Sequence, residues 1–89
     1  MLNRQIVIVN RLGLHARAAA RFVQTAASFP CEVTIVKGGS KINGKSIMGL
    51  MMLAASQGTE LDICTDGTDE EAAMKALVDL IDARFGEPE

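Results

Sequence analysis

Residues 31–42, with the sequence CEVTIVKGGSKI, contain the clearest structural signal in this chain of 89 residues. Cys31, Val33 and Ile35 alternate with polar residues, which predicts a strand with one buried face. Gly38–Gly39 follows and predicts a hairpin turn into a second short strand over residues 40–42. We therefore expect an antiparallel hairpin over residues 31–42.

The N-terminal side of the hairpin predicts one strand and one helix. Residues 4–10 include the β-branched run IVIV, which favours a strand buried on both faces. Residues 12–14 form a turn, and an alanine-rich segment from Ala16 to just before Pro30 predicts a helix. Its apolar side chains recur at helical spacing and form one stripe: Ala19, Phe22, Val23 and Ala26.

The C-terminal side predicts a short helix, a strand and a long helix, separated by turns that contain glycine. Ser46 is a favourable N-cap for a helix through about Leu53, and residues 59–65 alternate as a strand. Thr68 and Glu71 predict a capping box at the start of the last helix, which runs to about Phe85. Its inward side chains are expected to be Ala73, Leu77, Leu80 and Ile81.

The resulting order, β-α-β-β-α-β-α, predicts a single α+β domain over residues 1–89. We expect one antiparallel four-stranded sheet, covered on one face by three helices.

The composition excludes several classes of protein. Hydrophobic residues make up 48% of the chain and charged residues 22%, which argues against a disordered chain, and no apolar run approaches a membrane span. Aromatic residues are only 3%, which argues against modules that bind nucleic acid by stacking bases. One histidine and two cysteines leave too few ligands for an ordinary zinc site, so we expect neither a metal nor another cofactor.

The cysteines and the N-terminus bear on the cellular location. The strand phases place Cys31 and Cys64 on opposite faces of the sheet, which argues against a disulfide between them. No signal segment opens the sequence. We therefore expect a cytoplasmic protein with reduced thiols.

Charge is distributed unevenly, although the net charge is only −2. Residues 1–45 contain seven basic residues and one acid, whereas residues 46–89 contain two basic residues and ten acids. One explanation is structural, since acids are favourable at the start of the last helix. The other is functional: the basic half faces an anion or an acidic partner.

His15, the only histidine, lies between a turn that contains glycine and the start of a predicted helix. The free amides and the positive dipole end of a helix N-terminus hold anions, and the Arg17 guanidinium can bind phosphate oxygens. This cationic setting favours a neutral imidazole, which is a nucleophile. The alternative is a histidine that only caps the helix.

Two segments carry a resemblance to a known family. Residues 13–17, GLHAR, resemble the active-site signature of the histidine-containing phosphocarrier protein family (HPr) of the bacterial phosphotransferase system. Residues 44–50, GKSIMGL, resemble that family's regulatory serine segment, and the likeness extends over essentially the whole chain. The resemblance implies an open-faced β-sandwich, in agreement with the order of elements derived above.

The resemblance also implies a function. His15 would accept a phosphoryl group on Nδ1 from enzyme I, which takes it from phosphoenolpyruvate, and would pass it to a histidine of an enzyme IIA protein. Arg17 would stabilise the phosphate, and the chain would be a carrier rather than an enzyme. The family usually has proline where this chain has Ala18, and we expect that alanine to restore an amide donor near the anion. The sugar branch and the nitrogen-related branch (the NPr paralogue) both stay open.

Ser46 has a structural and a regulatory interpretation. As an N-cap it stabilises its helix, and the resemblance adds phosphorylation by an HPr kinase/phosphorylase in some members. Phosphate there would add negative charge to a face that meets acidic partners and would weaken enzyme I docking. The alternative function from a different class is a purely regulatory HPr-like docking protein that acts through phosphorylated Ser46.

The helix after Ser46 is too short to bury all of its apolar side chains. Ile47, Met48 and Met51 are expected on one face, where flexible methionines suit a surface that fits several partners. The resemblance makes this face the docking site for enzyme I and enzyme IIA, with Arg21 and Lys45 on a basic rim. We expect a monomer, because the carrier presents one face to successive partners.

Overall fold

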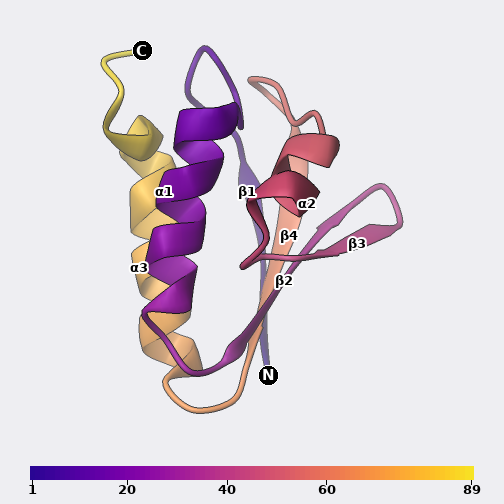
Figure 1. The fold of residues 1–89 in the computed structure, drawn as a ribbon, viewed down its shortest axis with the longest axis vertical. Helices are drawn as coiled ribbons and strands as arrows, with labels where there is room; N and C mark the ends of the chain where they lie inside the picture. Colours follow the sequence, from indigo (N-terminus) through magenta and orange to yellow (C-terminus); the bar gives the residue numbers. More distant parts are fainter.

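The computed structural model describes residues 1–89 as a sheet with helices on one face (Figure 1). The four strands are β1 (Leu2–Val7), β2 (Glu32–Lys37), β3 (Ser40–Asn43) and β4 (Glu60–Asp66). The three helices are α1 (Ala16–Ala27), α2 (Ile47–Met52) and α3 (Glu70–Asp82), and a 3-10 turn follows at Arg84–Gly86. All strand pairs are antiparallel, in the order β1-β4-β2-β3. The predicted fold class and element order are confirmed.

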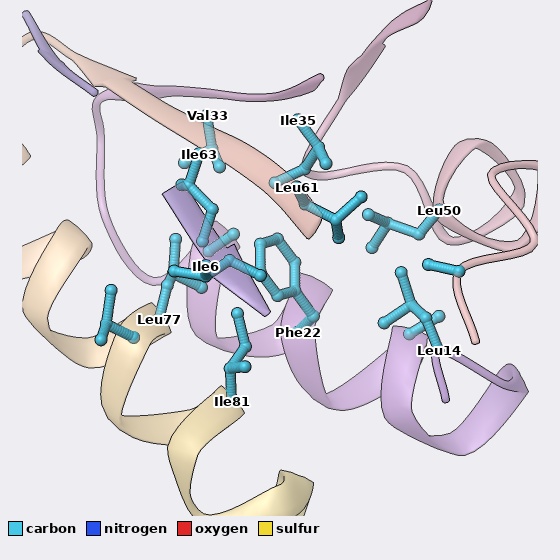
Figure 2. Close-up of a cluster of buried hydrophobic side chains, with 14 of the residues drawn as sticks. Ile6, Leu14, Phe22, Val33, Ile35, Leu50, Leu61, Ile63, Leu77 and Ile81 are labelled. Atoms are coloured by element: carbon cyan, nitrogen blue, oxygen red, sulfur yellow. The ribbon is translucent and has the colours of Figure 1, made fainter. Parts of the chain in front are cut away.

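The core lies between the sheet and the helices. Helices α1 and α3 run side by side, and α2 packs against α1 (Figure 1). Ile6 of β1 and Ile63 of β4 point from the sheet toward Phe22 of α1 and Leu77 of α3 (Figure 2). No helix is both long and apolar enough to cross a membrane.

The predicted hairpin of β2 and β3 forms as expected. Gly38 and Gly39 have φ values of 53° and 89°, the left-handed pair that a two-residue hairpin turn needs. Lys37 pairs with Ser40 across the turn. Cys31 is buried beside this strand, whereas Cys64 alternates with core residues and is only partly buried, as the strand phases predict.

Strand β1 differs from its prediction. It begins and ends earlier than residues 4–10, and it is not buried on both faces. Ile6 and Ile8 are buried, but Val7 and Val9 are 44% and 39% exposed. The reason is the architecture: helices cover one face of the sheet only, so alternate side chains of β1 face solvent.

The ends of α3 also differ from their predictions. The N-cap is Asp69, with φ of 63° and no side-chain capping bond, so the capping box of Thr68 and Glu71 does not form. Instead, the Glu70 carboxylate accepts a hydrogen bond from the backbone amide of Gly67 at 3.2 Å.

The helix ends at Asp82, three residues before the predicted end. Arg84 and Phe85 then adopt φ values of 58° and 55°, and this turn buries Phe85 completely in the core. The turn directs the last residues to the end of the molecule where α1 begins (Figure 1).

Candidate functional site

The loop that leads into α1 is fixed by backbone and side-chain contacts. Asn10 is fully buried, and its Nδ2 donates to the carbonyl oxygen of Gly13 at 2.8 Å. The amide of Leu14 donates to the carbonyl of Ala55 at 2.8 Å. Gly13 has φ of 69°, and a Cβ there would lie 2.5 Å from the Ala55 oxygen, so this close approach requires glycine. The loop therefore presents the next residue, His15, in a defined position.

His15 is the N-cap residue of α1, but its side chain does not cap the helix. Its backbone is extended, with φ of −78° and ψ of −179°, and the imidazole makes no capping hydrogen bond. The side chain is 29% exposed. The interpretation of His15 as a simple helix cap is therefore wrong, and the ring is accessible to a partner.

The start of α1 offers the predicted anion-holding groups. Ala16 and Arg17 are exposed, and as the first helical residues their amides have no acceptor within the helix. The Arg17 guanidinium forms no salt bridge with the chain. Ala18 is completely buried, so the exposed part of this helix end consists of Ala16 and Arg17.

Sequence reasoning missed Glu87, which lies against the His15 ring. The Nε2 atom of His15 contacts Oε2 of Glu87, whose side chain is only 11% exposed. The other carboxylate oxygen accepts a hydrogen bond from Asn10 Nδ2 at 2.9 Å. That hydrogen bond is the main reason why the pKa of Glu87 is lowered. Burial raises the pKa, whereas the neighbouring His15 and Arg17 lower it further. At neutral pH the imidazole therefore has an ionised carboxylate at Nε2.

The last residues of the chain lie along the same loop. Glu89 forms a salt bridge with Arg11 at 2.7 Å, and the Arg84 side chain donates to the Pro88 carbonyl at 3.3 Å. A hollow of about 270 Å³ lies beside this segment and is lined by Arg11, Leu12, Arg17, Glu87, Pro88 and Glu89. The basic half of the sequence thus faces two acids of the chain's own C-terminus.

Ser46 occupies its predicted position as the N-cap of α2. Its Oγ accepts a hydrogen bond from the amide of Gly49 at 3.1 Å, so the structural role is confirmed. Lys37 donates to the carbonyl of Leu53 at 2.7 Å, at the C-terminal end of the same helix. Both ends of this short helix are therefore held by side chains.

Helix α2 exposes the predicted apolar face. Ile47, Met48 and Met51 are 41%, 75% and 46% exposed, whereas Leu50 is buried. Met52, at 81% exposed, extends the same surface. We call these four exposed side chains, Ile47, Met48, Met51 and Met52, the α2 patch.

The two residues predicted for a basic rim both have backbone partners. Lys45 Nζ donates to the Phe29 carbonyl at 2.8 Å, and Arg21 donates to the Phe85 carbonyl. Arg21 therefore also holds the turn that leads to the C-terminal residues.

Comparison with known proteins identifies relatives over the whole chain. The sequence profile described as "PTS HPr component phosphorylation site" matches residues 2–83. The phosphocarrier protein HPr of Neisseria meningitidis serogroup A is 58% identical over 89 residues, which is all of both chains. The phosphocarrier protein NPr of Shewanella violacea is 43% identical and covers 97% of this chain and 94% of its own. The crystal structure of HPr-C-His from Thermoanaerobacter tengcongensis superposes with a TM-score of 0.96, at 50% identity and full coverage of both chains.

Proposed function

We propose, from the premise that this chain belongs to the HPr family of phosphocarriers of the phosphotransferase system, that His15 is the residue that carries the phosphoryl group. The group would come from enzyme I, which takes it from phosphoenolpyruvate. It would leave to a histidine of an enzyme IIA protein. In this proposal the chain is a carrier, and its partners supply the catalysis.

One observation carries the proposal. The His15 ring is accessible and does not cap its helix, and its Nε2 faces the Glu87 carboxylate. An ionised carboxylate only accepts hydrogen bonds, so Nε2 bears the proton and Nδ1 of the neutral ring has the free electron pair. In the transfer, Nδ1 forms a bond to phosphorus while the bond from phosphorus to the donor atom of enzyme I breaks.

Phosphoryl transfer needs mainly positioning and the stabilisation of negative charge. Arg17 and the open amides at the start of α1 supply positive charge beside the ring. The same groups would serve both the incoming and the outgoing transfer, because in each the phosphoryl oxygens are close to His15.

The α2 patch is the surface that we assign to docking of enzyme I and enzyme IIA. Exposed methionines are flexible and polarizable, which suits a surface that fits more than one partner. We include Arg21 and Lys45 as a basic rim, although both also bond to backbone carbonyls. We propose a monomer, which presents this surface to both partners in turn, and light scattering after gel filtration measures the molecular mass in solution.

We further propose Ser46 as a site of regulation by an HPr kinase/phosphorylase. Its side chain caps α2 directly before the α2 patch. A phosphate there would add about −1.5 to −2 units of charge next to the docking surface and would weaken an interaction with an acidic partner.

The proposal is tested by incubating the protein with enzyme I and radiolabelled phosphoenolpyruvate. We expect about one acid-labile phosphate per chain, transferred onward when an enzyme IIA protein is added. The variant His15→Ala should remain unlabelled. Labelling of this variant at the wild-type level would refute the assignment of His15.

A further inference from the structure

We propose that Glu87 is a positioning residue for phosphoryl transfer, which holds the His15 ring in the tautomer that leaves Nδ1 free. This inference rests on the proposed function, because it concerns the same ring. It assigns a role to a residue in the last three positions of the chain.

The carboxylate is held in place by a residue that is itself immobile. Asn10 is completely buried, and its Nδ2 donates both to the Gly13 carbonyl at 2.8 Å and to Glu87 Oε1 at 2.9 Å. A carbonyl oxygen can only accept, so the amino side of the Asn10 amide has to face Gly13 and Glu87. The buried Oδ1 of Asn10 has no hydrogen-bond partner. Asn10 thus donates to both acceptors while its own oxygen stays unpaired. A buried oxygen without a partner destabilises the fold, so the two donated bonds have to offset that cost.

The backbone on both sides of Glu87 is fixed as well. Phe85 is buried in the core, and Arg21 donates to its carbonyl. On the other side, Glu89 forms a salt bridge with Arg11 at 2.7 Å. Glu87 is therefore placed against the ring by contacts before it, behind it and after it.

The arrangement has a chemical consequence for the transfer step. When Nδ1 bonds to phosphorus, the proton on Nε2 remains, so the phosphorylated ring has positive charge shared by its nitrogens. The Glu87 carboxylate lies beside that charge throughout. In serine proteases a buried carboxylate fixes a histidine's tautomer and stabilises its imidazolium in the same way. No proton has to leave Nε2 at any point in the cycle.

The variant Glu87→Gln tests this role sharply. Since Asn10 presents only donors, the new amide has to turn its oxygen to Asn10 and its amino group to Nε2 of the ring. The ring would then accept at Nε2 and bear its proton on Nδ1, which blocks the nucleophile. We expect the nitrogen-15 spectrum of the unphosphorylated ring, recorded at a pH where it is neutral, to change from the Nε2-protonated to the Nδ1-protonated form. We expect the initial rate of phosphorylation by enzyme I to fall about tenfold or more.

Glu71→Gln is the matched control. It makes the same substitution at an exposed glutamate of α3 that forms no salt bridge and lies outside the site. Its ring spectrum and its rate should equal those of the wild type. If Glu87→Gln behaves like this control in either measurement, the positioning role is refuted.

The wild-type spectrum alone gives an independent answer, even if the variant does not fold. A wild-type ring that is mainly protonated on Nδ1 overturns the inference, and one protonated on Nε2 supports it. The spectrum needs no enzyme I, so failure of the wild type to accept phosphate would count against the proposed function and leave the tautomer result intact.

Discussion

At the scale of the residue, phosphoryl transfer to His15 depends on an Arg17 side chain that is free to bind phosphate. Its side chain is exposed and forms no salt bridge with the chain, although Glu87 and Glu89 border the same hollow. We expect Arg17→Ala to slow phosphorylation of His15 about 10²–10³-fold, the effect of removing one group that stabilises transition-state charge. Arg17→Lys should recover part of the rate, because it keeps the charge but not the two-point geometry.

The control for this prediction is Arg4→Ala, which removes an exposed arginine from β1. Rates of phosphorylation by enzyme I are measured for all three variants. Equal rates for Arg17→Ala and Arg4→Ala would show that Arg17 contributes only general charge.

The lowered pKa of Glu87 predicts that the protein loses stability in acid. Its pKa is lowered in the folded protein, chiefly by the hydrogen bond from Asn10. Folding therefore favours the ionised carboxylate, and this contribution is complete above the ordinary glutamate pKa of about 4.3. It is lost as the pH falls through the lower pKa of the folded state.

The measurement is urea unfolding at pH 7 and at pH 3. From pH 7 to pH 3 the free energy of unfolding should decrease more in the wild type than in Glu87→Gln. The variant has no carboxylate to protonate at this position. An equal loss in the two proteins would contradict a native-state role for the ionised form.

At the scale of the element, α2 depends on its cap because it has only six residues. Ser46→Ala removes the acceptor for the Gly49 amide and should cost about 1 kcal/mol of unfolding free energy. Ser46→Asp keeps a capping oxygen, so its stability should stay near that of the wild type. It places a negative charge before the α2 patch, and we expect slower phosphorylation by enzyme I. The proposed regulation is wrong if Ser46→Asp and wild type are phosphorylated at the same rate.

Elements were predictable where local signals were strong. The alternation after Cys31, the Gly38–Gly39 turn and the Ser46 cap all reflect short-range chemistry, and all three form as expected. The exposure of β1 depends on which face the helices cover, and the end of α3 depends on how Phe85 reaches the core. Such tertiary effects override local propensity, and the sequence pattern does not contain them.

At the scale of the whole molecule, the site combines residues from the two ends of the chain. His15 and Arg17 were predictable because they are neighbours in sequence. The contact of His15 with Glu87 spans 72 positions and depends on the turn around Phe85. The only sequence signal for it was a pair of acids after Gly86 in a chain with seven of its nine basic residues in the other half.

The docking surface is also a property of the whole molecule. Met48→Glu should raise the KM for this protein in the enzyme I reaction about fivefold or more, as expected for a central contact residue facing an acidic partner. Its stability should change little, because Met48 is 75% exposed. Val7→Glu is the control, since it adds the same charge at an exposed apolar position on β1. Equal KM values for the two variants would place docking elsewhere.

Nuclear magnetic resonance of the nitrogen-15-labelled protein, recorded after phosphorylation by enzyme I and phosphoenolpyruvate, tests whether His15 carries the phosphoryl group. We expect a phosphoryl group on one ring nitrogen, Nδ1 of His15, with Nε2 still protonated. A phosphoryl group on Nε2, or an unchanged His15 spectrum in the presence of an active enzyme I, would refute this assignment.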